Sequence, residues 1–354
     1  MKALVLSGGK GTRLRPLTHT MAKQLVPVAN RPVLHYVMQH LAAAGLTEVG
    51  VIISPETGAQ IEASLAENPW GLTFTYILQD QPLGLAQAVK MARPFLGDDP
   101  FVMYLGDNLI GQGLEAFIAT FTAGGADAAI LLKEVDNPQA FGVAEVDGAG
   151  RVVTLVEKPP VPPSNLALVG AYVFSPAIHD AIDQTKPSWR GELEITDAIR
   201  LLLEQGRQVH SSILESWWLD TGKKDDLLEA NRVVLDEFAT RRIDGEVSAD
   251  SKIYGRVTLG AGARVTGSTI RGPVIVGENT VIEDSFIGPF SSVGAGCQVI
   301  RSTIEHTVLL DAAKVIDVPR LDDSVLGKNA TVRTHAAGHP SLRLHLGDDS
   351  EVIL

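Results

Sequence analysis

A chain of 354 residues with 45% hydrophobic and 20% charged residues has the composition of a globular protein and is long enough for two domains. Its formal net charge of −12 argues against a nucleic-acid partner, and its single cysteine, Cys297, excludes an internal disulfide framework and fits a reducing cytoplasm. No apolar run has the length of a signal peptide or a membrane span, so the sequence predicts a cytoplasmic protein without a membrane partner.

The chain starts with a short apolar strand at residues 3–6 that ends in a glycine-rich loop. Gly8, Gly9 and Gly11 let the backbone bend tightly and bring its N–H groups close to an anion. The loop is not a Walker loop, because it lacks the GK[ST] ending. It is not a dinucleotide fingerprint either, because Leu14 stands where the third glycine is needed.

Two cations follow this loop. The guanidinium of Arg13 matches the geometry of phosphate oxygens, and Lys23 adds a second positive charge. A glycine turn, a planar fork and a point charge within about twenty residues predict a polyphosphate site.

Strands alternate with helices up to residue 240, which predicts a catalytic domain over residues 1–240. Strands are expected at 48–53, 73–78, 101–105, 128–132, 142–145, 152–156 and 167–174, and helices at 31–44, 61–65, 86–92, 194–204 and 225–238. The alternation indicates an α/β, Rossmann-like fold with a mostly parallel mixed sheet. Ligands bind such sheets at the carboxyl ends of strands, which is where Leu6 and Asp107 fall.

The periodicity changes after residue 243. Aliphatic residues then recur in steps of six, six and five, which predicts a β-solenoid over residues 241–335 with four to five coils between residues 253 and 326. A solenoid of this length leaves a terminal coil exposed. The segment 336–354 is therefore expected to be a cap, and a partner subunit in a homo-oligomer is the alternative cover.

Two aspartates, Asp107 and Asp220, each stand in a turn at a strand end. Alone, each would be an ordinary turn residue, but as a pair facing a polyphosphate they are candidate Mg²⁺ ligands. Lys158 and Arg190 are further candidate cations. No histidine or cysteine occurs in these motifs, and a phosphate monoester, mostly dianionic at neutral pH, can attack phosphorus without a general base.

Taken together, the ordered motifs LSGGKGTRLRPLT, LGLAQA, LGDN, EKP, RGELEITDAI and WLDTG resemble those of the sugar-1-phosphate nucleotidyltransferases. The Lys23-Gln24 pair is similar to the thymidylyl branch, and the resemblance to its long form covers nearly the whole chain. It implies a left-handed β-helix at the C-terminus. It also implies the reaction of dTTP with glucose 1-phosphate, which gives dTDP-glucose for deoxysugar biosynthesis and pyrophosphate, with Mg²⁺ as cofactor.

The resemblance also implies roles for individual residues. The catalytic residues would be Arg13, Lys23, Lys158, Asp107 and Asp220, the two aspartates holding the metal. The nucleotide would contact Leu6, Gly8, Gly9, Gly11, Thr12, Arg13, Gln24, Gln79, Pro82 and Gly84. The sugar phosphate would contact Asn108, Gly142, Glu157, Lys158, Leu168 and Arg190. Phe141 departs from the tyrosine common in short thymidylyltransferases.

Three alternatives remain open on sequence grounds. The enzyme could use UTP or another sugar 1-phosphate. The chain could be a catalytically silent regulatory protein that binds a sugar nucleotide, although its cations and carboxylates are all present. The solenoid could be an acyltransferase with His306 as base, although a lone histidine is more often structural.

Overall fold

The computed structural model describes residues 1–148, 150–334 and 348–353. The chain divides into two compact units. The first contains Met1–Lys10, Met21–Leu25 and Val33–Asp220. The second contains Gly11–Thr20, Val26–Pro32 and the described part of Thr221–Leu354. Helix α8 thus belongs to the second unit, and the domain limits expected at residues 240 and 335 remain predictions. The expected cap at 336–354 lies largely outside the described residues.

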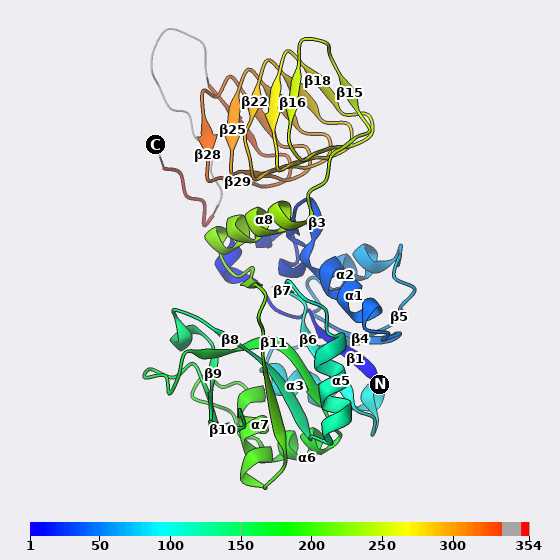
Figure 1. Ribbon diagram of the computed structural model, residues 1–354, viewed down its shortest axis with the longest axis vertical. Helices are drawn as coiled ribbons and strands as arrows, with labels where there is room; N and C mark the ends of the chain where they lie inside the picture. Colours follow the sequence, from blue (N-terminus) through cyan, green and yellow to red (C-terminus); the bar gives the residue numbers. More distant parts are fainter. Residues whose placement is uncertain (149, 335–347, 354) are drawn as a thin grey trace. The chain divides into compact units, whose positions relative to one another are not determined.

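A mixed sheet forms the centre of the first unit (Figure 1). Its strands are β1 (Lys2–Leu6), β4 (Glu48–Ile53), β5 (Thr73–Leu78), β6 (Phe101–Leu105), β8 (Ala128–Glu134), β9 (Gly142–Val146), β10 (Val152–Glu157), β11 (Leu166–Phe174) and β12 (Val209–Ile213). The strand order is β10-β9-β11-β6-β1-β4-β5, with β8 pairing β11 and β12. Strands β6, β1, β4 and β5 are parallel, whereas β11 is antiparallel to β6, β8 and β9. This confirms the mostly parallel mixed sheet.

Helices α1 to α7 belong to the same unit. They are α1 (Val33–Ala43), α2 (Gly58–Leu65), α3 (Leu85–Met91), α4 (Arg93–Leu96), α5 (Glu115–Gly124), α6 (Ala177–Gln184) and α7 (Ile195–Glu204). The predicted helix at 31–44 begins two residues later, because Arg31–Pro32 (β3) pairs instead with Pro27–Val28 (β2).

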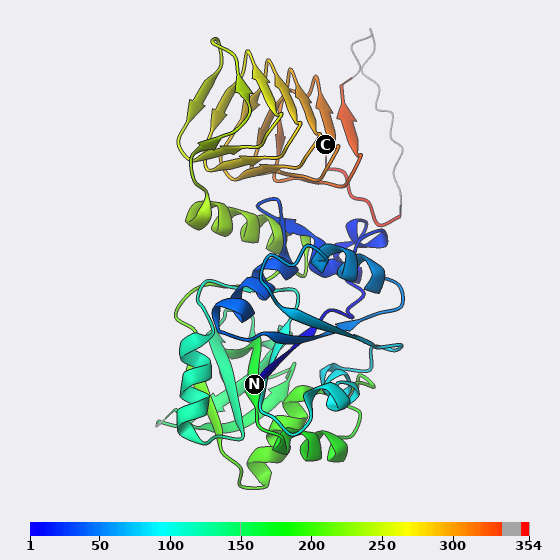
Figure 2. The same cartoon turned by 90° about the vertical axis from the view of Figure 1, so that its right-hand side faces the viewer.

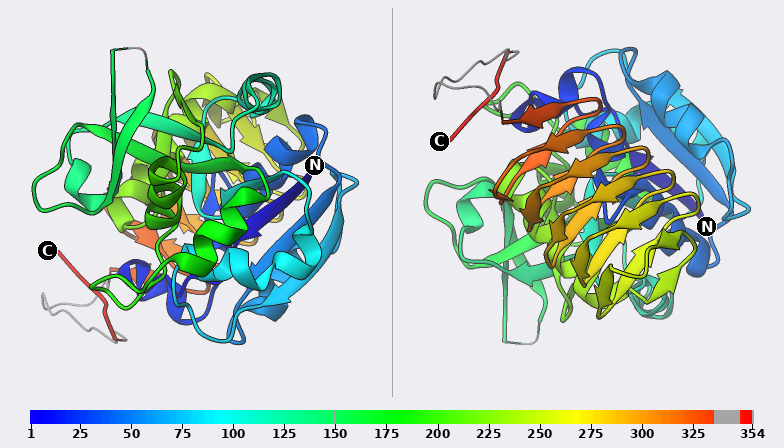
Figure 3. Two further views of the ribbon diagram at one scale, coloured as in Figure 1. Left: turned by 90° about the horizontal axis from the view of Figure 1, so that it is seen from below. Right: turned by 90° about the horizontal axis from the view of Figure 1, so that it is seen from above.

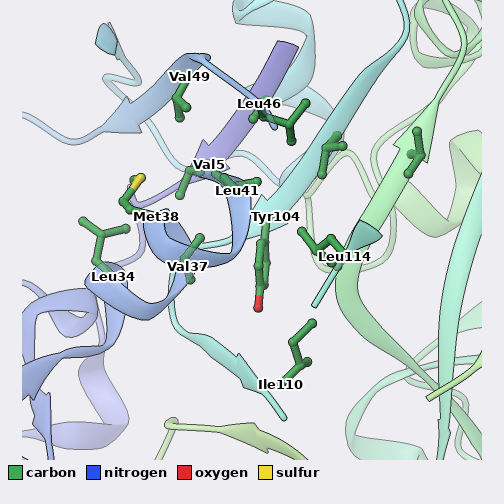
Figure 4. Close-up of a cluster of buried hydrophobic side chains, with 14 of the residues drawn as sticks. Val5, Leu34, Val37, Met38, Leu41, Leu46, Val49, Tyr104, Ile110 and Leu114 are labelled. Carbon is green, nitrogen blue, oxygen red and sulfur yellow. The ribbon is translucent and has the colours of Figure 1, made fainter. Parts of the chain in front are cut away.

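Two apolar clusters give the sheet its core. One gathers the buried face of α1 against β1, β4 and β6, and Figure 4 shows Leu34, Val37, Met38 and Leu41 from that helix beside Tyr104. The other joins α3, α6 and α7 to residues of the same strands that point the opposite way. The sheet is therefore covered on both faces, which leaves the strand ends as the place for chemistry.

The second unit contains a β-helix (Figure 2). Its strands are β14 (Arg242–Ile243), β15 (Glu246–Val247), β16 (Lys252–Tyr254), β17 (Val257–Leu259), β18 (Arg264–Thr266), β19 (Thr269–Arg271), β20 (Val274–Val276), β21 (Val281–Glu283), β22 (Phe286–Ile287), β23 (Ser291–Val293), β24 (Gln298–Ile300), β25 (Thr303–Glu305), β26 (Val308–Leu309), β27 (Lys314–Ile316), β28 (Leu321–Asp322), β29 (Val325–Leu326) and β30 (Thr331–Arg333). Among the described residues they form three parallel sheets of six, six and five strands, the arrangement of a left-handed β-helix (Figure 3).

The inward-facing residues explain the repeat. Ile253, Ile270, Ile287 and Ile304 pair in register from one coil to the next, and Cys297 is fully buried among similar residues, as its repeat position predicts. The repeat of 17 residues gives between four and five coils over residues 253–326, as predicted. The β-helix continues beyond this range, because β14 pairs with β17 and β30 pairs with β27, although β14 and β30 carry exposed residues.

Helix α8 (Lys224–Phe238) and the small β2–β3 hairpin join this unit through one buried side chain. Oδ1 of Asn231 accepts from the backbone N–H of Ala29 at 2.9 Å and from the hydroxyl of Ser292 at 2.6 Å. Its Nδ2 donates to the carbonyl of Phe290 at 2.9 Å. No helix in the described parts of the chain combines the length and apolarity needed to span a membrane.

Candidate active site

The loop after β1 leaves buried polar atoms unsatisfied. Among the described residues, Ser7 Oγ and Gln24 Oε1 are buried and have no hydrogen-bond partner. A methyl group on Gly8 would lie 2.7 Å from Oε1 of Gln79, and one on Gly9 would lie 3.7 Å from Nε2 of Gln24. Buried polar groups are normally paired, so these atoms are ones that a bound ligand would satisfy. The structure thus gathers Gly8, Gly9, Gln24 and Gln79 beyond Leu6.

The loop that carries Pro82 and Gly84 rests on the segment before α7. Gly84 has a φ of 108°, and a methyl group there would lie 2.3 Å from the carbonyl oxygen of Leu193, so only glycine fits. The N–H of Leu193 donates to the carbonyl of Leu83 at 2.7 Å. Pro82 itself is exposed.

Gly11, Thr12 and Arg13 belong to the second unit, and their nucleotide-binding roles remain predictions. Gly11 has a φ of 61° before a short 3₁₀ turn at Thr12–Leu14. Burial raises the pKa of the Asp226 carboxyl, and the charges of Lys223 and Arg13 act against that rise. Arg13 is therefore close to the first turn of α8.

Lys23, Asp107 and Asp220 form one cluster within the first unit. Strand β7 (Asn108–Ile110) pairs antiparallel with β13 (Trp218–Asp220), and this pairing sets Asn108 opposite Asp220. Nζ of Lys23 donates to Oδ2 of Asp107 and lies 3.5 Å from Oδ1 of Asp220. Two carboxylates that are 113 positions apart in the sequence thus share one buried ammonium.

The cluster favours an ionised Asp107 carboxylate. Burial works to raise the pKa of Asp107, but the charge and hydrogen bond of Lys23 outweigh it, so the pKa lies below its ordinary value. In the described parts of the chain, no group of three or more histidine, cysteine, aspartate or glutamate residues could hold a metal. A divalent cation at this pair would take its other ligands from substrate phosphates or water, as Mg²⁺ commonly does.

A second cluster is centred on Glu157. Its carboxylate accepts from Oγ1 of Thr196 at 3.2 Å and lies 3.6 Å from Nη1 of Arg190 and 3.7 Å from Nζ of Lys158. Nη1 of Arg190 is also 3.4 Å from Glu194, a carboxyl whose pKa is raised by burial. These contacts bring together Glu157, Lys158 and Arg190 as predicted.

Strand β11 connects the two clusters. A methyl group on Gly170 would lie 3.0 Å from Cγ of Asn108. A methyl group on Gly142 would lie 3.0 Å from Oε2 of Glu157 and 3.8 Å from Cδ1 of Leu168. Asn108 therefore lies against β11, and Gly142, Leu168 and Glu157 lie close to one another; their role in binding a sugar phosphate remains a prediction.

Some residues at the site were not predicted. Nε1 of Trp218 donates to Oδ1 of Asn108 at 2.6 Å, and the Trp218 ring packs on Phe141 with centroids 4.9 Å apart. Thr196 orients Glu157, and Ser7 contributes an unpaired hydroxyl. Trp218 lies inside the WLDTG motif and Thr196 inside the RGELEITDAI motif. Their place in these motifs was the signal by which the sequence could have identified them as site residues.

His306 is less suited to base catalysis. Its Nδ1 contacts Asp323, and its Nε2 is buried and has no hydrogen-bond partner among the described residues. The acyltransferase hypothesis gains no support from this geometry.

The sequence was compared with models of known protein families. A family model described as "Nucleotidyl transferase" matches residues 2–237, two thirds of the chain. The chain belongs to the nucleotidyl transferase family. The match spans every residue of the two clusters.

Two curated relatives match the chain over almost its full length. This nucleotidyl transferase is 50% identical over 354 residues to a glucose-1-phosphate thymidylyltransferase of Streptomyces antibioticus, with 99% of each chain covered. It is 47% identical over 358 residues, with 100% of each chain covered, to the low-salt glycan biosynthesis nucleotidyltransferase Agl11 of Haloferax volcanii. A crystal structure of a glucose-1-phosphate thymidylyltransferase from Bacillus anthracis matches with a TM-score of 0.62 and 34% identity, covering 66% of this chain and 94% of that one.

Proposed function

We propose that this protein transfers a thymidylyl group from dTTP to glucose 1-phosphate, giving dTDP-glucose and pyrophosphate. The observation that carries the proposal is the cluster of Lys23, Asp107 and Asp220 at the strand ends of a nucleotidyl transferase fold. The thymidylyl and glucosyl specificity is supported by the full-length relative with 50% identity that bears this activity in its name.

The reaction needs charge neutralisation more than proton transfer. A phosphate oxygen of glucose 1-phosphate attacks the α-phosphorus of dTTP, the bond from that phosphorus to the bridging oxygen breaks, and pyrophosphate leaves. The attacking oxygen is already deprotonated at neutral pH, so no base is required. Lys23 neutralises the α-phosphate, Arg13 neutralises the pyrophosphate, and Lys158 with Arg190 orients the sugar phosphate.

The remaining contacts position the substrates. The loop from Gly8 to Thr12, with Gly9 and Gly11, holds the nucleotide, and Gln79 with the backbone near Gly84 recognises the pyrimidine. The other proposed nucleotide contacts are Leu6, Gln24 and Pro82. Asn108, Glu157 and the backbone of Gly142 and Leu168 bind the glucose hydroxyls.

Asp107 and Asp220 would hold the Mg²⁺ ion. The two carboxylates already converge on one cation, Lys23. Carboxylate oxygens are also the ligands that a hard divalent ion requires. When bound, the ion supplies further positive charge for the phosphate oxygens. We also propose that the protein works in the cytoplasm as a homo-oligomer and that its product enters deoxysugar biosynthesis.

A matrix of nucleoside triphosphates against sugar 1-phosphates tests the specificity. Each combination is scored by kcat/KM from pyrophosphate release in the presence of Mg²⁺. We expect the highest value for dTTP with glucose 1-phosphate. A higher value for UTP or for another sugar phosphate would assign the enzyme a different substrate specificity within the family. No turnover with any pair would favour the alternative of a catalytically silent regulatory protein.

A further inference from the structure

Lys23 occupies the space between the two carboxylates assigned to the metal. Its side chain is 9% exposed and those of Asp107 and Asp220 are 19% and 24% exposed, so solvent reaches the carboxylates more easily than the ammonium. The ammonium donates to Asp107, which also accepts from Nδ2 of Asn108 at 3.0 Å. All three ionised residues lie in the first unit.

In this arrangement one ammonium group lies against two carboxylates. Buried carboxylates need a partner charge, because burial without one strongly disfavours ionisation. Lys23 supplies that partner from within the chain. A divalent cation coordinated by the same oxygens would lie within a few ångströms of the ammonium, where two positive charges repel each other strongly in a medium of low dielectric constant.

We propose that Lys23 is a built-in competitor of the divalent cation at Asp107 and Asp220, and that a nucleotide phosphate relieves the competition by drawing the ammonium away. This inference rests on the proposed assignment of the two aspartates to the metal. Lys23 then has two successive partners, the carboxylates in the free protein and the α-phosphate in the complex.

The binding of the metal and the binding of the nucleotide are then thermodynamically linked. If nucleotide binding removes a competitor of the metal, each ligand must raise the affinity of the protein for the other by the same factor. The free protein would therefore bind the metal weakly and acquire it together with the nucleotide. The full set of charges would assemble only when the triphosphate is in place.

Mn²⁺ binding, followed by electron paramagnetic resonance without nucleotide, tests the competition. Lys23→Met is expected to bind Mn²⁺ at least tenfold more tightly than the wild-type protein, because the competing charge is gone. Lys23→Gln keeps a hydrogen-bond donor against Asp107 and gives the same test should Lys23→Met fail to fold. Equal or weaker binding by the folded variants would overturn the inference.

A matched control uses another lysine–aspartate pair of the first unit. Nζ of Lys90 lies 2.8 Å from Oδ1 of Asp183, at an exposed position. Lys90→Met should leave Mn²⁺ binding unchanged. A gain equal to that of Lys23→Met would show a general effect of net charge and would contradict the inference.

Thymidine monophosphate tests the relief of competition, because it carries only the phosphate that Lys23 is proposed to contact. Saturating thymidine monophosphate should tighten Mn²⁺ binding several-fold in the wild-type protein and have little effect in Lys23→Met. An equal effect in both proteins would contradict the inference.

Double variants separate this inference from the metal assignment. Adding Asp107→Asn or Asp220→Asn to Lys23→Met should abolish the tight Mn²⁺ site. If these doubles bind as tightly as Lys23→Met alone, the metal assignment itself is wrong. If they lose binding while Lys23→Met is no tighter than wild type, the assignment stands and only the competition is refuted.

Discussion

The indole N–H of Trp218 donates to Oδ1 of Asn108 at 2.6 Å, across the antiparallel pair formed by β7 and β13. This bond holds the side-chain amide of Asn108, which also donates a hydrogen bond from Nδ2 to the carboxylate of Asp107. Trp218 thus orients a residue assigned to the sugar, and Phe141 packs on the Trp218 ring.

Trp218→Phe should weaken sugar-phosphate binding. The substitution removes the N–H, leaves the buried Oδ1 of Asn108 without its partner and keeps an aromatic ring in place. We expect KM for glucose 1-phosphate to rise about tenfold, equivalent to ~1.4 kcal/mol. KM for dTTP should change little.

Trp217→Phe serves as the matched control for that measurement. Trp217 packs on Gly111, away from Asn108. A methyl group on Gly111 would lie 2.6 Å from the Trp217 ring. Steady-state kinetics should give near wild-type KM values. A larger rise in KM for Trp217→Phe than for Trp218→Phe would contradict the positioning role.

Asp107→Asn and Asp220→Asn should each remove most turnover. An amide is a weaker ligand for a hard cation than a carboxylate, so kcat/KM should fall roughly a hundredfold or more while the fold is retained. Circular dichroism checks the fold, and pyrophosphate release gives the rate. Asp225→Asn, at a side chain that is 89% exposed, is the control and should keep its activity. Near-normal rates for both site variants would discredit the metal assignment.

His179 is expected to make stability depend on pH. It is 2% exposed, neither ring nitrogen has a hydrogen-bond partner in the part of the chain that the structure describes, and burial lowers its pKa. The unfolded chain therefore takes up a proton as the pH falls below about 6.5, whereas the folded protein resists protonation. The free energy of unfolding consequently decreases as the pH falls through this range.

His179→Leu should raise stability by about 1 kcal/mol at neutral pH, because a side chain of similar volume replaces unpaired polar atoms. It should also reduce the loss of stability between pH 7.5 and pH 5.5. Thermal unfolding of both proteins at the two pH values measures this. The same loss in the variant as in the wild type would show that His179 is not the titrating group.

Asn231→Ala should destabilise the second unit by at least about 2 kcal/mol. The substitution leaves the N–H of Ala29, the hydroxyl of Ser292 and the carbonyl of Phe290 without partners, at about 1–3 kcal/mol for each group that remains buried. Hydrogen exchange should accelerate in the peptide containing Ala29. Asn231→Asp, which keeps the accepting oxygen, should be milder, and unchanged exchange in Asn231→Ala would contradict this account.

Much of the fold was predictable because its signals are local or strictly repeated. Residues 48–53, 73–78 and 101–105 form the expected strands. The clearest signal is at 101–105, a continuous apolar run of the kind that marks a strand buried on both faces. The β-helix was visible from inward-facing residues such as Ile270 and Ile287. The aliphatic pattern itself covers only the inner coils, because exposed side chains such as Arg242 and Thr331 interrupt it in the first and last strands.

The site was predictable in its charges but not in its supporting contacts. Asp107 and Asp220 were identified because each follows a strand, and their convergence on Lys23 agrees with the proposed pairing. The bond from Trp218 to Asn108 and the three contacts of Asn231 depend on pairings between distant segments. No local periodicity encodes such pairings, so only the structure reveals them.

The most direct measurement is the identification of the product by mass spectrometry after incubation of the protein with dTTP, glucose 1-phosphate and Mg²⁺. The account predicts dTDP-glucose and pyrophosphate in equal amounts, with both lost in Asp107→Asn. Hydrolysis of dTTP without transfer of the thymidylyl group to glucose 1-phosphate, or formation of the sugar nucleotide at an undiminished rate by Asp107→Asn, would contradict it.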